Sequence, residues 1–403
     1  MTRKPGIFAS AAIAAVVVAS SLGAALGQTQ SPTSLGFKKR FVIELTNPSP
    51  LELENRPVVL SVAEVRAFAP DFNSSNYAIF DESGGAYRLV VSQTDALDQD
   101  RSHQEIVFLR SLAPSSTTRL ACYYSPLGTF QLMVSSPKAN ARLLSGGLGR
   151  VLAGWESNLA GFKFVDGRIE TYGKLYPGLV LTKAVAEDAK LQEWGLNILA
   201  GGRSLGLGGL SVWEGGAAIP LAAAGAGGDF AIRRTVVAAG PLRALVRIEY
   251  AAAKPGSRGD GIILLLSAFA DNICSRQDIS LGARAAGPAV CGVSVQKLTG
   301  EEVSFDQNQG CLAAWGRGAE GLGEIGLAAL FTPSDLAGLD ENGPGRTLKL
   351  NIRPGRKLTV WTVGGWERGI VTAAVPAATN WARQAKDLGL RLRVPVEVRF
   401  KAK

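Results

Sequence analysis

The sequence is poor in the residues that bind transition metals. It has one histidine, His103, and four cysteines without close pairing: Cys122, Cys274, Cys291 and Cys311. Zinc and iron sites are built largely from clusters of these residue types, so the sequence gives no support for either metal. Beyond the first 27 residues, no apolar run is long enough to cross a bilayer as a helix.

The first 27 residues are predicted to be a cleaved signal peptide. Arg3 and Lys4 give a positive start, and an apolar run follows over residues 7–22. Ala25-Leu26-Gly27 then supplies small residues for cleavage before Gln28. The alternative is an uncleaved anchor helix, and the lack of a nearby cysteine disfavours a lipid anchor. We therefore expect a periplasmic or secreted protein, not membrane-bound after cleavage.

The four cysteines are compatible with more than one state. In an exported chain, four cysteines are compatible with two disulfides, and a bridge among Cys274, Cys291 and Cys311 is the preferred expectation. Buried free thiols are the alternative.

The net charge is +9 for the chain and +7 without Arg3 and Lys4. The basic residues are spread out, with no stripe or module that reads nucleic acid, although a basic surface can attract acidic glycans.

Short apolar runs between turn residues predict a mainly β protein with antiparallel sheets. We expect a linker over residues 28–40, a small β-sandwich over 41–144 and a larger sandwich over 145–403. Two helices are predicted: one from a capping box at Ser61–Glu64, the other from about Asn380 to Leu388, capped by Thr379 and ended by Gly389. The runs that predict strands are 41–45, 88–91, 106–109, 244–250, 262–266 and 358–363.

One serine motif is rejected on its context. Residues 202–206 have the letters G-x-S-x-G of a nucleophile elbow, centred on Ser204. The elbow requires a helix after the serine and a histidine further along the chain. Here Leu207-Gly208-Gly209 follows, and His103 lies upstream, so serine-hydrolase chemistry is disfavoured.

An acidic loop precedes the predicted strand at 106–109. Asp95, Asp98, Asp100 and Glu105 are close in sequence, and dense carboxylates of this kind can bind calcium. Asp98, Asp100 and Glu105 are the candidate ligands. A solvated acidic turn is the alternative, because the spacing is not that of an EF-hand.

The segment 154–213 holds most of the candidate site residues. Aromatic side chains can cover the apolar faces of a sugar, while charged and amide groups fix its hydroxyls and carboxylates. The alternative is that the tryptophans are core residues. The candidate catalytic residues are Tyr172, Lys174 and Glu193, and the candidate substrate-binding residues are Trp155, Glu156, Trp194, Asn197, Arg203, Trp213 and, further along, Arg243.

The chain resembles an exported bacterial family known as domain of unknown function 4861 over nearly all of its length after the signal. No single motif is decisive, but their order is specific. They are Leu45–Ser49 with Arg56–Val59, Asp98–Asp100 with Glu105–Leu109, Gly154–Ser157, Tyr172–Lys174, Trp194–Leu199, Ser204–Gly209, Gly240–Ala244, Gly364–Trp366 and the helix around Trp381. The resemblance implies a galactose-mutarotase-like β-sandwich that takes part in polysaccharide degradation, often of uronic-acid glycans.

Two functional hypotheses follow from the resemblance and from the candidate residues of segment 154–213. The first is an enzyme that acts on acidic glycans, either as a lyase or as a hydrolase. A lyase would use Tyr172 or Lys174 as base and Arg203 or Arg243 to bind the uronate carboxylate. A hydrolase would need two carboxyl groups, and Glu156 with Glu193 is the candidate pair. The second hypothesis is a non-catalytic glycan-binding protein of a polysaccharide-utilisation system. It is favoured by the absence of a histidine from residues 184–192, where relatives tend to carry one.

Overall fold

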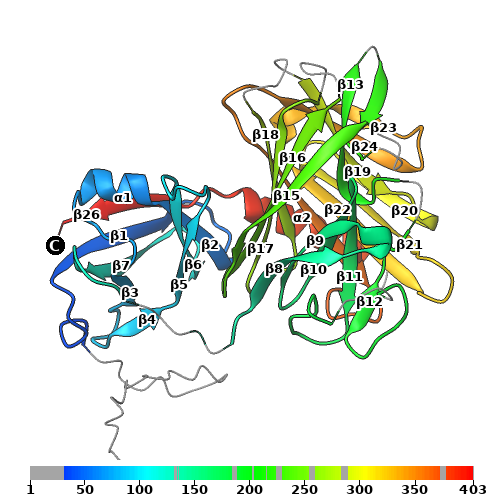
Figure 1. Ribbon diagram of the computed structural model, residues 1–403. Helices are drawn as coiled ribbons and strands as arrows, with labels where there is room; N and C mark the ends of the chain where they lie inside the picture. The colour runs from blue at the N-terminus through cyan, green and yellow to red at the C-terminus, as the bar shows by residue number, and fades with distance from the viewer. Residues whose placement is uncertain are drawn as a thin grey trace, which may run out of the picture.

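The computed structural model describes residues 31–130, 134, 136–183, 188–201, 204–214, 216–223, 229–253, 259–282, 289–372 and 378–402. The predicted signal peptide and Arg203 lie outside these residues. The described part is mainly β, as predicted, with a small sandwich followed by a larger one (Figure 1). None of the described helices is long and apolar enough to span a membrane.

The small sandwich is formed by two antiparallel sheets around one apolar core. Alternation along β1 and β6 turns Ile43, Leu45 and Phe108 into this core, where each is fully buried. Helix α1 (Val62–Phe68) begins after Ser61, whose side chain makes no cap hydrogen bond, so the predicted capping box is not formed. In spatial order the strands are β26 (Glu397–Lys401), β1 (Lys39–Asn47), β7 (Ser116–Tyr124), β3 (Tyr77–Asp81) and β4 (Arg88–Val90) in one sheet, and β2 (Leu53–Ser61), β6 (Gln104–Leu112) and β5 (Ser92–Ala96) in the other.

The predicted domain boundaries need two corrections. The last strand, β26, returns to the small sandwich and pairs antiparallel with β1, with Val42 opposite Lys401. At the other boundary, Leu144 lies inside β8 (Ala139–Ser145), which pairs with β9 of the larger sandwich. A division at residue 144 therefore cuts a strand, and the range 145–403 includes a strand of the other sandwich. Pairing between distant strands depends on tertiary contacts that local sequence patterns do not record.

The larger sandwich contains three sheets, named here C, D and E. Two short 3₁₀ turns, Gly147–Gly149 and Pro333–Asp335, connect strands. In spatial order, sheet C has β12 (Gly195–Asn197), β11 (Arg168–Lys174), β10 (Gly161–Val165), β9 (Val151–Ser157) and β8. Sheet D has β14 (Ala217–Pro220), β13 (Leu207–Glu214), β19 (Ala289–Gln296), β24 (Gly345–Ile352) and β23 (Leu336–Asp340). Sheet E has β15 (Phe230–Ala239), β16 (Arg243–Ala252), β17 (Ile262–Phe269), β18 (Ser275–Leu281), β25 (Leu358–Trp366), β22 (Glu324–Phe331), β21 (Cys311–Arg317) and β20 (Thr299–Asp306).

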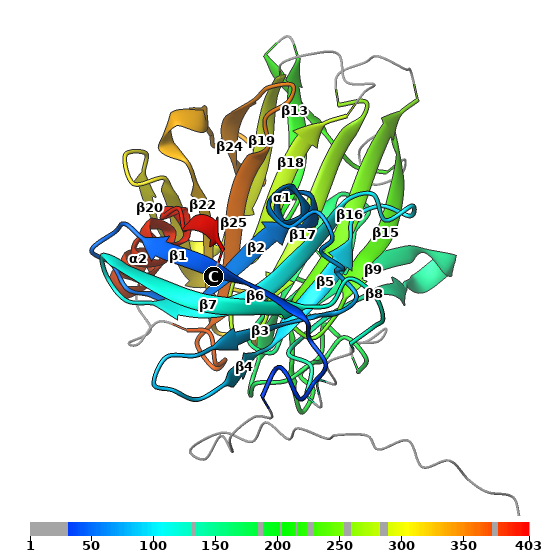
Figure 2. The same cartoon turned by 90° about the vertical axis from the view of Figure 1, so that its left-hand side faces the viewer.

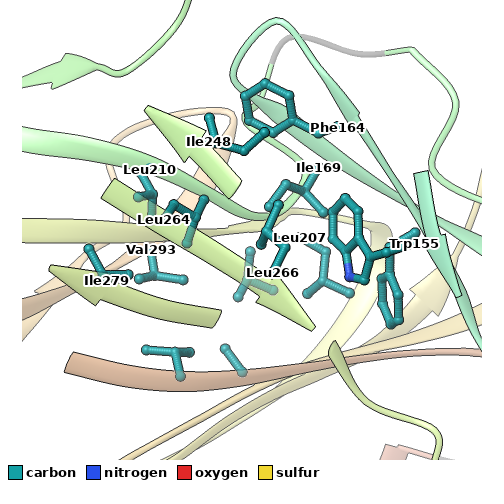
Figure 3. Packing of buried hydrophobic residues seen from close by; sticks show 14 of the residues in the cluster. Trp155, Phe164, Ile169, Leu207, Leu210, Ile248, Leu264, Leu266, Ile279 and Val293 are labelled. Atoms are coloured by element: carbon teal, nitrogen blue, oxygen red, sulfur yellow. The ribbon is translucent and has the colours of Figure 1, made fainter. Parts of the chain in front are cut away.

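The core of the larger sandwich lies between sheet E and the paired sheets C and D. Figure 3 shows Leu264 and Leu266 of β17 gathered with Trp155 and Ile169 of sheet C and with Val293 of sheet D. Each of these side chains is fully buried. Burial of a leucine-sized side chain stabilises the fold by about 1.5–3 kcal/mol, so this cluster fixes how the sheets face each other.

Helix α2 (Ala378–Arg393) covers the outer face of sheet E at β21 and β22. Trp381 packs beside Trp315 and donates its indole N–H to the Leu327 carbonyl at 3.2 Å. The helix runs past Gly389, which was predicted to end it. The last turn is held by tertiary contacts instead, since Leu392 is buried and Arg393 donates to the Phe331 carbonyl at 3.2 Å.

All four cysteines are buried free thiols. The preferred expectation of a bridge among Cys274, Cys291 and Cys311 was therefore wrong, and the alternative is the one observed. These three lie on or beside β18, β19 and β21, and Cys291 packs in the main core while the other two face α2. Burial raises the pKa of all three thiols to about 12, so each remains protonated and acts as a small apolar residue.

Candidate functional site

Charged side chains line the outer face of sheet C. Strand β11 is buried on both faces, and alternation places Ile169 in the core while Arg168, Glu170, Tyr172 and Lys174 project to the other side. A strand that carries charges on a covered face requires partners for each of them. The partners come from neighbouring strands and from residues 175–183 and 188–194, together named here the covering segment, which lie over this face.

The covering segment packs onto the sheet through apolar side chains. Val180, Leu181 and Trp194 form a cluster with Tyr172, and the Trp194 ring lies edge-on to the Tyr172 ring with centroids 5.4 Å apart. Gly154 of β9 leaves the room that Leu181 fills, since a Cβ there would lie 2.7 Å from the leucine. Trp194 therefore helps to enclose the site rather than presenting a free ring.

Glu156 and Lys174 form a fully buried ion pair. Lys174 Nζ donates to Glu156 Oε2 at 2.7 Å and to the carbonyls of Ser157 and Gly178 at 2.7 and 2.6 Å. The Glu156 carboxylate also accepts the backbone N–H groups of Val180 and Leu181. Neither side chain has any exposed surface. All three ammonium protons are engaged, so Lys174 is not placed to act as a base, and Glu156 is not placed to act as a hydrolase carboxyl. Both predicted roles are corrected.

A second group of polar side chains, named here the polar cluster, lies nearer the surface. It consists of Lys163, Arg168, Glu170, Tyr172, Asp188 and Asn197. Lys163 Nζ is shared by two carboxylates, at 2.6 Å from Asp188 Oδ2 and 3.1 Å from Glu170 Oε2. The Tyr172 hydroxyl donates to the same Asp188 oxygen at 2.9 Å. The side chains of Lys163 and Asp188 are 11% and 12% exposed, so the cluster is in contact with solvent.

The surroundings of Tyr172 keep its hydroxyl protonated. Burial, reinforced by the negative charge of Asp188, raises the pKa of Tyr172 well above its ordinary value of 10. A phenol of this kind is a hydrogen-bond donor at neutral pH and a poor base. The prediction of Tyr172 as the proton-abstracting group of a lyase is therefore not supported by its environment. Asp188, which accepts from both Tyr172 and Lys163, is the better-placed acceptor.

Asn197 and Arg168 complete the polar cluster. Asn197 Nδ2 donates at 2.6 Å to Glu170 Oε2, the same carboxylate oxygen that pairs with Lys163. Arg168 pairs with Glu170 Oε1 at 3.1 Å and donates to Gln296 Oε1 at 2.9 Å. Two cations and two carboxylates make the cluster neutral overall, with several donors and acceptors that a hydroxyl-rich ligand could exchange for its own.

Two glycines allow the strands around the cluster to approach. Gly195, at the start of β12, has φ +128°, and a Cβ there would lie 1.9 Å from the Gly173 carbonyl oxygen. Gly206 has φ +74°, and its Cβ would lie 1.9 Å from the Ile169 oxygen. Only glycine fits at either position. The Trp-Gly sequence therefore carries the backbone geometry that places β12 and Asn197 beside β11, and the Leu-Gly sequence lets the chain before β13 approach Ile169.

Other predicted residues lie elsewhere. Trp155 is in the core, stacked on Phe162, with its indole N–H donated to Ser275 Oγ at 2.9 Å, so it does not line a site. Glu193 is exposed on the covering segment, whereas Glu156 is fully buried and engaged with Lys174, so the two are not placed to act together on a ligand. Trp213 is half-buried on sheet D. Arg203 lies outside the described residues.

Arg243 joins the two sandwiches instead of binding a substrate. The small sandwich lies in front of sheet E (Figure 2), and Arg243 of β16 forms ion pairs with Asp95 and Glu105 of the small sandwich, both at 2.7 Å. Gln93 Oε1 also accepts the backbone N–H of Arg243 at 2.9 Å. The guanidinium is 5% exposed, so its predicted role as a carboxylate clamp is replaced by a structural one.

The acidic loop does not form a cation site. Glu105 points to Arg243, while Asp98 accepts from Ser102 Oγ at 2.8 Å and pairs with the His103 ring. Asp100 caps the backbone of Ser102 within the same turn. Among the described residues, no three histidine, cysteine or acidic side chains are grouped to hold a metal ion. The predicted calcium ligands Asp98, Asp100 and Glu105 are thus directed to different partners.

The sequence prediction missed Lys163, Arg168, Glu170 and Asp188. A signal for Lys163 existed in Asp166-Gly167, a dipeptide typical of two-residue hairpin turns. Both residues have positive φ, and the hairpin that they form places Lys163 directly opposite Glu170. No such local signal marks Asp188, because the covering segment brings it to the sheet.

The match to known families agrees with the sequence resemblance. The family model "Domain of unknown function (DUF4861)" matches residues 45–145 and 153–398. The chain therefore belongs to the DUF4861 family, whose description names no activity. No curated protein matches this sequence.

Solved structures with a similar arrangement include two from Enterococcus faecalis. One is a protein in glycosyl hydrolase family 38, with 9% sequence identity and a TM-score of 0.45. The other is an alpha-mannosidase, with 10% identity and a TM-score of 0.43. Each match covers 90% of this chain but only 47% and 46% of the respective solved chain. The chain thus spans less than half the length of either protein.

Proposed function

We propose that this protein is an exported carbohydrate-active protein whose site is the polar cluster on sheet C. The observation that supports this most is the sharing of one ammonium, Lys163, by Glu170 and Asp188 next to the protonated Tyr172 hydroxyl. Closely spaced donors and acceptors at the solvent boundary suit a ligand rich in hydroxyl groups. Export is inferred from the signal-like residues 1–27, and N-terminal sequencing of the secreted form tests it: an intact Met1 would refute cleavage.

The substrate class that we propose is a uronic-acid-containing oligo- or polysaccharide. In a lyase reaction, Asp188 would take the proton α to the uronate carboxylate, and Lys163 would neutralise the charge that develops there. Tyr172, held protonated, would orient Asp188. In a hydrolase reaction, Asp188 and Glu170 would be the carboxyl pair, since Lys163 Nζ contacts both.

A non-catalytic glycan-binding protein is the second candidate, and one observation favours it. Lys174 and Glu156, which the sequence suggested as a base and as a hydrolase carboxyl, are fully buried and engaged with each other. If Asp188 also serves only to order the covering segment, the cluster would bind sugars without proton transfer.

Product analysis separates the candidates. The chain from Gln28 onward is incubated with a panel of acidic and neutral oligosaccharides, and the products are weighed by mass spectrometry. Fragments whose masses sum to the parent indicate a lyase, fragments with an added water indicate a hydrolase, and intact sugars with a calorimetric binding signal indicate a binding protein. Asp188→Asn and Lys163→Gln should lower the activity or the affinity, while Lys183→Gln, an exposed lysine of the covering segment, should not. No binding and no product across the panel would refute the proposal.

A further inference from the structure

The outer faces of sheets C and D adjoin each other. Ile169 of β11 pairs with Gly206 immediately before β13, which joins the two sheets. At this junction Arg168 donates to Gln296 Oε1 of β19, at 2.9 Å. Val293 and Val295 of β19 point into the core, so Gln296, Ser294 and Gly292 follow one another on the outer face. This row of residues runs from Gln296, at the polar cluster, to the buried Ser294 and then to Gly292, beneath Trp213.

Trp213 differs from the tryptophans of the core. Trp155, Trp315, Trp366 and Trp381 are each at most 4% exposed, and each donates its indole N–H to an acceptor. Trp213 is half-buried, and its indole nitrogen is itself buried, without a hydrogen-bond partner among the described residues. The exposed part of the ring, and not the N–H group, is therefore what a ligand can contact.

A lysine accompanies the Trp213 ring. Lys349 of β24 lies opposite Gly292, and its Nζ is 4.7 Å from the ring centroid. The indole lies across Gly292, because a Cβ at that glycine would be 3.2 Å from the indole nitrogen. Lys349 makes no ion pair with another described residue. An aromatic ring beside a cation that has no ion-pair partner among the described residues suits a sugar that carries a negative group, the ring covering its apolar face and the ammonium pairing with its charge.

The spacing along β19 indicates the length of the ligand. From Gln296, at the edge of the polar cluster, to Gly292, beneath Trp213, the strand advances about 13 Å. One sugar ring cannot contact both places, whereas an oligosaccharide of several rings can. We propose that Trp213 and Lys349 form a distal subsite for an acidic residue of an oligosaccharide whose other end occupies the polar cluster. This inference rests on the proposed function and adds a length and charge requirement to it.

Calorimetry with defined oligomers tests the distal subsite. The probes are oligogalacturonides of increasing length, each as the free acid and as the methyl ester, which has the same length but no charge. For wild type, affinity should rise by about tenfold once the oligomer reaches Trp213, equivalent to about 1.4 kcal/mol. Trp213→Ala should remove this gain and Trp213→Phe should keep part of it. Lys349→Gln should remove the preference for the free acid in long oligomers only.

The controls separate failure of the subsite from failure of the proposed function. Lys38→Gln makes the same change of charge at an exposed position of the chain outside this surface and should leave affinity unchanged. If short oligomers bind but Trp213→Ala retains the full gain with length, the distal subsite is refuted and the polar cluster stands. If no oligomer of any length binds, both proposals are refuted. Thermal unfolding of each variant verifies that the fold is retained, and Lys349→Gln, a surface change, tests the subsite even if Trp213→Ala does not fold.

Discussion

Replacing Lys174 by methionine should destabilise the fold severely. The ammonium has no exposed surface and donates three hydrogen bonds of 2.6–2.7 Å, one of them to the equally buried Glu156. Methionine keeps most of the aliphatic stem but leaves the Glu156 carboxylate buried without its counter-ion, with only the two backbone N–H groups as partners. Breaking a buried pair in this way costs about 3–5 kcal/mol. Burial also lowers the pKa of Lys174, so part of the folding free energy is already used to keep it charged.

The assay is urea unfolding followed by tryptophan fluorescence, compared with Lys183→Met. Lys183 is an exposed lysine of the same covering segment, and its replacement should change the free energy of unfolding by less than about 0.5 kcal/mol. The double variant Glu156→Gln with Lys174→Met removes both charges and should recover part of the loss, because the two side chains are directly coupled. If Lys174→Met folds with wild-type stability and yet loses all activity on a true substrate, the structural role is wrong and Lys174 is a catalytic residue.

Three further outcomes follow from the structure. The pKa of His103, the only histidine, should lie above its usual 6.5 because Asp98 stabilises the imidazolium. This interaction contributes to stability below pH 6.5, and the contribution is lost as the pH rises through the raised pKa. Asp98→Asn should lower the pKa of His103, measured by NMR. Arg243→Met should lower the free energy of unfolding by about 3–5 kcal/mol and split the calorimetric unfolding transition into two. A single unchanged transition would contradict the role of Arg243 in joining the two sandwiches. Deleting residues 397–403 should expose the edge of β1 and promote association, visible by light scattering; a fully monomeric, equally stable product would contradict this.

The strands could be predicted because their signal is local. The run at residues 244–250 alternates between core and outer face along β16, and the run at 358–363 does so along β25. The alternation of apolar and polar residues along a strand can be seen in the sequence without knowing the partner strand. The end of α2 could not be predicted in the same way, because Leu392 and Arg393 are held by contacts with sheet E that outweigh the helix-ending tendency of Gly389.

The candidate site was predicted in part for a related reason. The sequence grouped Tyr172, Lys174, Glu156 and Asn197 only as candidates within segment 154–213, and in the structure all four side chains lie on the outer side of sheet C. The sequence could not show which of the four side chains is free to act on a ligand, because that depends on how deeply each one is buried. The number of cysteines could not distinguish a disulfide from buried thiols either, because Cys274 and the other three cysteines can also pack in the core as small apolar side chains.

Depth also explains how the two charged groups on sheet C divide their roles. Glu156 holds the backbone of Val180 and Leu181, so the buried pair with Lys174 anchors the first half of the covering segment. In residues 188–194 of the segment, Asp188 contacts Lys163 and Tyr172 nearer the surface. A tyrosine and a lysine two residues apart on β11 therefore act at different levels: Lys174 orders the segment, and Tyr172 meets the carboxylate that the segment brings. In the Tyr-Gly-Lys motif Lys174 therefore has a supporting role, and the chemistry that we propose belongs to Tyr172 together with Asp188 and Lys163.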